Sequence, residues 1–124
     1  MRPEERTRFI DHKGTRVLHF DYRGVRDPEE ALAAIRHSMG EARKHPPKSL
    51  RIMTSVRDAR YNTAVLQALK ELASVNEPYV KASAVVGMGG LHRIAYQAVI
   101  LFSRRKLQTF DSEEEALDWL VQQT

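Results

Sequence analysis

Near its N-terminus the chain alternates between hydrophobic and polar residues with the two-residue period of a β-strand. This pattern predicts a strand at residues 15–22 and a shorter one at residues 7–11. Gly14 lies in the polar segment between them, where a tight turn needs positive φ. The two strands are therefore predicted to form a hairpin. The second strand carries Val17, His19 and Asp21 on one face and Leu18, Phe20 and Tyr22 on the other.

Farther along, apolar residues recur every three or four positions in four segments, as they do in amphipathic helices. Two of the helix starts are marked by Asp27 followed by Pro28, and by Ser112 with Glu115 three residues later. The helices are predicted at residues 28–44, 62–75, 91–102 and 113–121. Short apolar runs at residues 50–54, 82–86 and 107–110 predict three further strands between them.

The segment from Ala82 to Phe102 decides the fold class. It runs from a short apolar strand through a glycine-rich turn directly into a helix, which is the repeating unit of α/β proteins. The run Ala84–Val86 suits a strand that is buried on both faces, as in parallel sheets. The order β-β-α-β-α-β-α-β-α predicts an α/β fold with a mostly parallel sheet and one antiparallel edge strand. At 124 residues, the chain is expected to form one domain over residues 1–124.

Composition narrows the class of protein further. The chain has no cysteine, which excludes disulfides and cysteine-ligated metals. The longest apolar run without a charge, Ile94–Ser103, is half of the ~20 residues that a membrane span needs. The N-terminal residues are charged and lead into no apolar signal segment. A cytoplasmic protein without a membrane span is the prediction.

Charge is distributed unevenly along the chain. The first 110 residues hold all twenty Lys and Arg against eleven of the sixteen acids, and the last fourteen residues hold the other five acids. Such a basic surplus can steer a domain toward nucleic acid. The basic residues are scattered, however, and no aromatic interleaving or nucleic-acid motif accompanies them. A solvated basic surface without nucleic-acid binding is the preferred interpretation.

The glycine-rich turn Gly87–Gly90, with His92 and Arg93 just after it, could hold an anion on its backbone N–H groups. It lacks the Gly-Lys-Ser/Thr ending of a Walker loop and the spacing of the dinucleotide fingerprint. The alternative is that the glycines only make a close connection between strand and helix. No cofactor is predicted.

Two other sets of residues contain part of a metal site or of a catalytic site, but neither set is complete. His19 and Asp21 share a strand face and could be two ligands of a metal ion, but no third ligand can be named. Ser55, Asp58 and His92 supply the residue types of a catalytic triad without a nucleophile elbow. We therefore predict neither a metal site nor an enzyme.

The predicted helix at residues 91–102 has a wider apolar arc than one buried face requires, because Tyr96, Val99 and Ile100 extend it. The extra surface could form a homodimer, receive a partner helix or line a lipid pocket. It could also be covered by the C-terminal helix, whose Trp119 lies at the margin of its own apolar arc.

Three stretches of the sequence, Ala59–Asn62, Pro78–Gly87 and Phe110–Leu120, resemble the SpoIIAA-like family. This family is related to the STAS domains of sulfate transporters and anti-sigma-factor antagonists, and in fold to the lipid-carrying CRAL-TRIO domains. The similarity extends from about Phe9 to Val121. It implies a small cytosolic α/β domain that works by binding.

The resemblance also implies a mode of regulation. In STAS modules a kinase phosphorylates a Ser or Thr at the start of the helix after the third strand, and the added charge ejects the domain from its partner. The usual Asp-Ser-Ser-Gly pattern is replaced here by Tyr61–Ala64, so Thr63 alone keeps a hydroxyl group. Thr63 is therefore the candidate phosphoacceptor. The alternative is that Asn62 or Thr63 simply caps the helix.

The leading hypothesis is a non-enzymatic regulatory module that binds a protein partner, similar to an anti-sigma-factor antagonist. The alternative is a carrier of a small apolar ligand or lipid, held between the sheet and the helix at residues 91–102. Because the carboxyl ends of parallel strands meet at one edge, the loops after two strands are expected to form the binding surface. Its candidate residues are Ser55, Arg57, Arg60, Asn62, Gly89, Gly90, His92 and Arg93.

Overall fold

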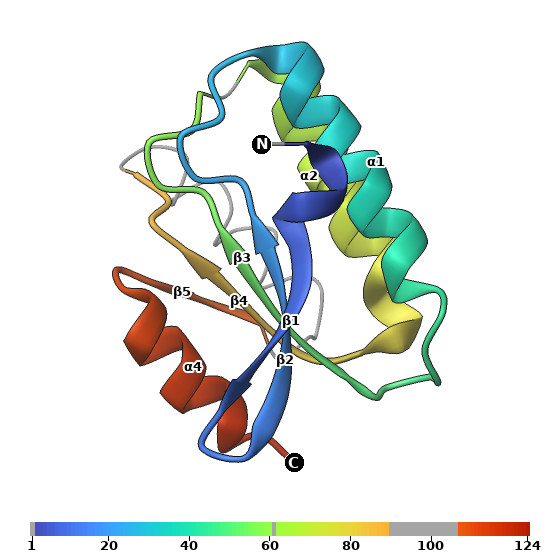
Figure 1. Cartoon of the computed structure of the whole chain (residues 1–124), viewed down its shortest axis with the longest axis vertical. Coiled ribbons are helices and arrows are strands. Elements are labelled where there is room, and N and C mark those ends of the chain that lie inside the picture. Colours follow the sequence, from blue (N-terminus) through green and yellow to red (C-terminus); the bar gives the residue numbers. More distant parts are fainter. Residues whose placement is uncertain (1, 61, 90–106) are drawn as a thin grey trace.

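The computed structural model describes residues 2–60, 62–89 and 107–124 (Figure 1). Within these residues, five strands form one sheet in the order β1-β2-β3-β4-β5. β1 and β2 are antiparallel, whereas the other neighbouring pairs are parallel, as predicted. The predicted helix at residues 91–102 lies outside the described residues. The strands are β1 (Thr7–His12), β2 (Thr15–Asp21), β3 (Leu50–Ser55), β4 (Val80–Val86) and β5 (Leu107–Phe110), and the helices are α1 (Pro28–Ala42), α2 (Thr63–Asn76), α4 (Glu113–Val121) and the short 3-10 helices η1 (Pro3–Arg6) and η2 (Glu77–Tyr79).

The hairpin between β1 and β2 closes through the two residues Lys13 and Gly14. Both have positive φ, at 51° and 82°. A two-residue turn of this kind matches the right-handed twist of the strands that it joins. The prediction for Gly14 is confirmed, and Lys13 adopts the left-handed conformation as well. Its ammonium group forms an ion pair with Asp118 of α4 at 2.9 Å.

The sheet separates two hydrophobic clusters, as Figure 1 shows from the positions of the helices on either side of it. α1 and α2 cover one face, which carries Leu18, Phe20 and Ile52. α4 covers the other face, where Val17 and Met53 lie against Ala116 and Leu120. The alternation predicted for β2 thus assigns its residues to two different layers.

A buried group of hydroxyls fixes α1 on the sheet. The Tyr22 hydroxyl donates a hydrogen bond to Ser38 Oγ at 2.6 Å, and Thr7 Oγ1 lies 2.8 Å from the same atom. Ser38 in turn donates to the Ala34 carbonyl within α1. Burial raises the pKa of Tyr22 far above its usual range, although its bond to Ser38 acts in the opposite direction. At the helix start, the Asp27 side chain accepts a hydrogen bond from the Glu30 backbone, which confirms the predicted cap.

α4 is held to the sheet by both packing and hydrogen bonds. Small residues of β4, Ala82 and Ala84, are fully buried below it. The Arg51 side chain, from β3, donates to the carbonyls of Leu120 at 3.0 Å and Gln123 at 2.7 Å. Since the last carbonyls of a helix have no partner within it, Arg51 satisfies groups that the helix leaves free. The predicted Ser112 cap is confirmed by a hydrogen bond from the Glu115 backbone.

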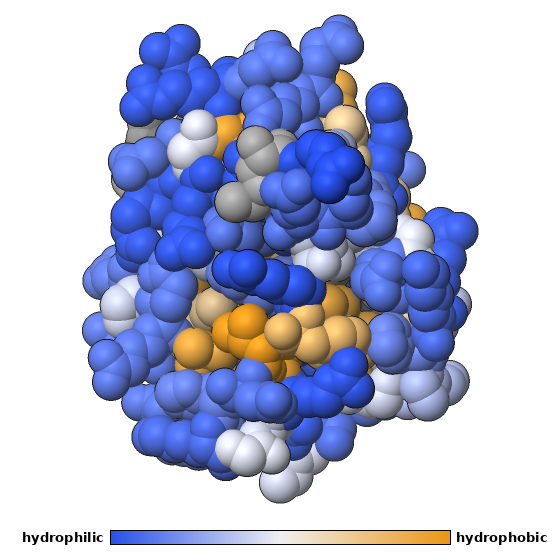
Figure 2. Space-filling model, in the orientation of Figure 1, coloured by the Kyte–Doolittle hydropathy of each residue, from blue (hydrophilic) through white to orange (hydrophobic). Residues whose placement is uncertain are grey.

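The molecular face in Figure 2 is mostly hydrophilic. One band of hydrophobic side chains crosses its middle, around the place where β1 crosses β2 in Figure 1. None of the helices in the described part of the chain has the length and apolar character needed to cross a bilayer. The predicted homodimer arc, Tyr96 to Ile100, lies outside the described residues, so the homodimer stays a prediction.

Candidate functional site

The loops that follow β2, β3, β4 and β5 meet at the carboxyl edge of the sheet. Backbone hydrogen bonds join them: Gly24 donates to the Arg57 carbonyl, Val56 to Val86, and Gly87 to Phe110. This edge therefore brings together the Arg57–Thr63 loop and the start of the glycine-rich turn. Gly90, His92 and Arg93 lie outside the described residues.

Arg57 connects three of these loops. Its guanidinium donates to both carboxylate oxygens of Glu113, at 2.6 and 3.0 Å, and to the Asp111 carbonyl. Gly87 crosses directly over its backbone: a Cβ on Gly87, whose φ is +83°, would lie 2.9 Å from Arg57 Cβ. Glycine is therefore required at this position, because an added side chain would meet backbone atoms. These contacts give Arg57 a structural role in joining the loops.

Asp21, at the end of β2, is buried and paired. Its carboxylate accepts hydrogen bonds from the Arg23 side chain at 2.8 and 2.9 Å. Burial by itself would raise the pKa of Asp21, but the hydrogen bonds from Arg23 outweigh it and lower that pKa to about 2. The carboxylate is thus ionised and already engaged, which leaves it poorly suited to a metal ion.

His19 lies beside Ser55, with Nε2 2.9 Å from Oγ. Burial lowers the pKa of His19, although the charge of Asp21 opposes the shift. A serine beside a histidine is the arrangement of a nucleophile and its base, yet Ser55 is 0% exposed. No substrate can reach the hydroxyl in this arrangement. In the triad that the sequence analysis considered, the histidine beside Ser55 was His92, which lies outside the described residues.

The start of α2 is the exposed part of this edge. The Asn62 side chain accepts a hydrogen bond from the Val65 backbone at 2.8 Å, so Asn62 is the cap and Thr63 is the first helical residue. Arg60, Asn62 and Thr63 are exposed, and so is Gly89. Thr63 is accessible to a modifying enzyme. Of the two residues that the sequence left open as the cap, the structure assigns the cap to Asn62.

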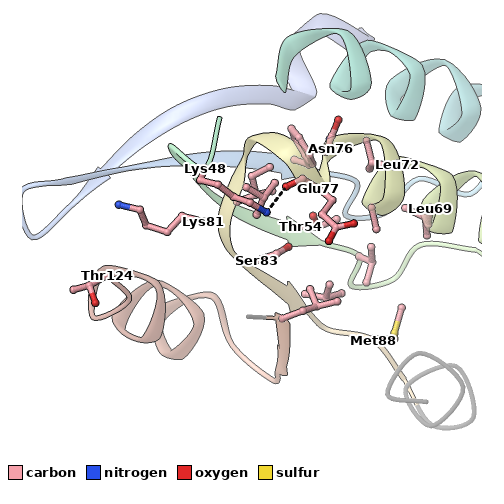
Figure 3. A pocket seen from close by; sticks show the side chains of 17 residues that line it. Lys48, Thr54, Leu69, Leu72, Asn76, Glu77, Lys81, Ser83, Met88 and Thr124 are labelled. Carbon is pink, nitrogen blue, oxygen red and sulfur yellow. Dashed lines mark hydrogen bonds between the residues drawn. The ribbon is translucent and has the colours of Figure 1, made fainter. Parts of the chain in front are cut away.

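A second site lies on the face of the sheet that α2 covers. There, α2 and strands β3 to β5 border a cavity of about 380 Å³ (Figure 3). This volume is at the lower end of the ~300–1,000 Å³ that is usual for small-molecule sites. Most of the wall is hydrophobic. The apolar side chains described in it are Phe20, Ile52, Val56, Leu69, Leu72, Ala73, Val80, Val85, Met88 and Leu107.

The polar residues of the cavity gather at one end. Lys48, Asn76, Glu77 and Lys81 line it near the amino ends of β3 and β4, and Thr124 lies at the same end in Figure 3. The loop before β3 is fixed there because the Lys48 ammonium group donates to the Glu77 carbonyl at 3.2 Å, and its backbone N–H to the Pro78 carbonyl. Thr54 and Ser83 add hydroxyl groups to the wall.

Asn76 is the unusual member of this wall. The residue is 2% exposed, and neither its Nδ2 nor its Oδ1 has a hydrogen-bond partner. Most buried side-chain polar atoms in folded proteins do have one. In the sequence, Asn76 stands in an Asn-Glu-Pro stretch directly after the predicted helix at residues 62–75. No pattern along the chain could show that its amide would be buried without a partner.

Among the residues that the structure describes, no three His, Asp or Glu side chains gather in a way that could hold a metal ion. His19 and Asp21, which the sequence analysis considered as two possible ligands before predicting no metal site, are bonded to Ser55 and Arg23. No protein-family model matches the sequence, and no curated protein is similar to it.

A solved structure resembles this chain over nearly its full length. It is described as that of an uncharacterised protein of the DUF3478 family, with a SpoIIAA-like fold, from Shewanella loihica PV-4. The two match with a TM-score of 0.71 over 92% of this chain and 91% of the other, at 16% sequence identity. The chain has a SpoIIAA-like fold. This agrees with the resemblance seen in the sequence, and at 16% identity it describes the architecture alone.

Proposed function

We propose that this SpoIIAA-like chain is a non-enzymatic binding domain that holds a small apolar molecule between α2 and the sheet. The observation that carries the proposal is the cavity of about 380 Å³ with its hydrophobic wall. This was the alternative hypothesis from the sequence, which placed the ligand against the helix at residues 91–102. Residues 91–102 lie outside the described residues, and the described walls of the cavity are formed by α2 and the strands.

The wall explains why an apolar molecule is favoured. Leu69 and Leu72 belong to the buried stripe of α2. Ile52 and Val85 line the cavity from the sheet, and Val56 lines it from just after β3. An apolar molecule in contact with such side chains gains roughly 25 cal/mol for each Å² of apolar surface removed from water. An enzymatic function is a weaker proposal, since the three polar pairs at the carboxyl edge, His19–Ser55, Asp21–Arg23 and Arg57–Glu113, are engaged with each other.

Binding can be tested with decan-1-ol, a neutral molecule with one aliphatic chain. We expect it to raise the melting temperature of the purified protein, with a stabilisation that grows with the logarithm of its concentration above the Kd. In Ser83→Leu the added side chain occupies the cavity, so the increase should be lost. Gln67→Leu, at an exposed position of α2 outside the cavity, is the matched control and should respond like the unaltered protein. Equal responses of all three proteins would contradict the proposal.

A second candidate function is the regulatory, protein-binding one, and a specific feature of α2 favours it. α1 and α4 each have acidic residues in their first turn, whereas α2 has none and begins with the exposed Thr63. A phosphate on Thr63 would place negative charge at the positive end of the helix dipole. The cytoplasmic location predicted from the sequence is consistent with such a role.

The regulatory role can be tested on protein recovered from its own cells. Intact-mass measurement should show a fraction carrying phosphate, which is lost in Thr63→Val. Any co-purifying partner should be retained by Thr63→Val and released by Thr63→Glu. Recovery of phosphate in Thr63→Val would place the modification elsewhere and contradict this candidate function.

A further inference from the structure

We propose that the cavity selects a single-chain aliphatic carboxylate, whose head group lies at the Asn76 end and whose chain runs toward Met88. The proposal rests on the proposed function, because it concerns the same cavity. It adds the orientation of the ligand and the chemistry of its polar end.

The orientation follows from the topology. α2 connects β3 to β4, which are parallel, so the helix runs back along the sheet and its last residue, Asn76, lies near the amino end of β4. Met88 follows the carboxyl end of β4. Figure 3 shows Lys48 and Lys81 at one end of the cavity, and Leu69 and Met88 at the other. The site is therefore polar at one end and apolar at the other, which matches an amphiphile lying along the strands.

The polar end has an excess of hydrogen-bond donors. Lys48 and Lys81 each carry an ammonium group with three N–H bonds, and the Asn76 amide adds two N–H donors and one acceptor oxygen, all without a partner. Lys48 uses one of its donors on the Glu77 carbonyl. Glu77 is the acidic side chain among the described lining residues. A carboxylate can accept hydrogen bonds from both ammonium groups and from Asn76 Nδ2, and its negative charge complements the two cations better than an alcohol or an amine does.

The size of the cavity limits the rest of the ligand. About 380 Å³ is small for a ligand site, and one unbranched chain fits such a volume better than two chains or a fused ring system. A chain of about ten carbons provides a soluble probe for the proposal, and the head group can be varied while the chain stays the same.

The experiment compares decanoate, decan-1-ol and decylamine at pH 7.5, by isothermal titration calorimetry on the unaltered protein. We expect decanoate to bind roughly tenfold more tightly than decan-1-ol, which corresponds to about 1.4 kcal/mol, and decylamine to bind most weakly. In the double variant Lys48→Gln, Lys81→Gln, decanoate should lose most of this preference while decan-1-ol keeps its affinity. The preference should also shrink as salt is raised.

Asn76 provides a second readout that a purely structural role would not produce. In Asn76→Leu, decanoate affinity should fall several-fold, while the unliganded protein should melt at a higher temperature, because the unpaired amide has been removed. Should Asn76→Leu not fold, the side-chain amide resonances of Asn76 in the unaltered protein should shift with decanoate more than with decan-1-ol.

The outcomes separate the two proposals. If none of the three probes binds, the proposed function fails and this inference fails with it. If all three bind with similar affinity, or if the lysine double variant keeps the preference for decanoate, the cavity binds apolar chains but does not select a carboxylate. In that case only this inference is overturned.

Discussion

The two faces of the sheet are covered in different ways, although the same strands supply both. Below α4 the side chains are small and fully buried, as at Ala82 and Ala84, and the helix lies directly on them. Below α2 the side chains are larger, and a cavity of about 380 Å³ separates the helix from β3 and β4. Among the described elements, α2 has its most extensive contacts with α1.

The proposed function assigns binding to the α2 face, and the polar contacts of the two faces differ in a way that supports this. On the α4 face, the described polar groups have protein partners: Arg51 is bonded to the helix end, His19 to Ser55 and Asp21 to Arg23. On the α2 face, Asn76 is buried without one. Because an unpaired buried amide destabilises a protein, its presence beside a cavity suggests that a ligand supplies the missing partner.

The comparison is tested most strongly by truncating one leucine on each face. Leu120→Ala, below α4, should lower the free energy of unfolding by about 3–4 kcal/mol, because the close packing leaves a new void. Leu72→Ala, which borders the existing cavity, should cost only about 2 kcal/mol. Urea denaturation of both variants measures the difference. Equal losses would show that the two faces are packed equally well.

The reverse of these truncations is to replace two neighbouring residues of β4, one facing each layer, by a larger side chain. Ala84→Leu forces extra atoms below α4 and should destabilise the protein by about 2–3 kcal/mol. In Ser83→Leu the larger side chain enters the cavity, so the free energy of unfolding should change by less than about 1 kcal/mol. Thermal melts of the two variants are sufficient, and a large loss in Ser83→Leu would contradict an open cavity.

The hydrogen bonds at the end of α4 have a smaller expected effect. Arg51→Met keeps the length of the side chain but leaves the carbonyls of Leu120 and Gln123 without their donor. We expect a loss of about 1–2 kcal/mol in urea denaturation. Amide exchange should accelerate in α4 and stay unchanged in α1. A uniform acceleration would mean that Arg51 supports the whole sheet rather than this helix.

The smallest expected effect is on pH dependence. Burial lowers the pKa of His19, so below the ordinary value of 6.5 the unfolded chain binds this proton more readily than the folded one. Stability should therefore fall as the pH falls through about 6.5. His19→Gln should lose less stability than the unaltered protein between pH 7.5 and 5.5. Asp21 affects stability at lower pH. Because folding lowers its pKa from 3.8 to about 2, its ionised carboxylate stabilises the fold above pH 3.8, and this stabilisation is lost as the pH falls from 3.8 to about 2.

Much of the described fold could be predicted from local sequence, because its determinants are local. The alternation in β2 identified both of its faces, and Asp27 and Ser112 identified two helix starts. The cap of α2 could not be assigned between Asn62 and Thr63, since both residue types serve that purpose. The structure gives it to Asn62, and Thr63 stays a predicted phosphoacceptor.

The candidate site depends on contacts between distant residues, which a linear pattern does not contain. His19 and Ser55 meet because β2 and β3 pair in a register that sets Asp21 beside Ser55. The sequence showed only that His19 and Asp21 share a strand face, where they were considered as two possible metal ligands, and no metal site was predicted. The cavity likewise depends on how α2 stands off the sheet, and the role of Asn76 depends on its burial there.

The alternation of β4 has a consequence for how such a protein can evolve. Ser83 faces the cavity and Ala84 faces α4, and the same rule applies along the neighbouring strand, where Ile52 and Met53 face opposite layers. Substitutions that reshape the cavity therefore fall on different codons from those that maintain the α4 layer. Successive changes in β3 and β4 could therefore reshape the cavity step by step, each neutral for the layer on the far side of the sheet.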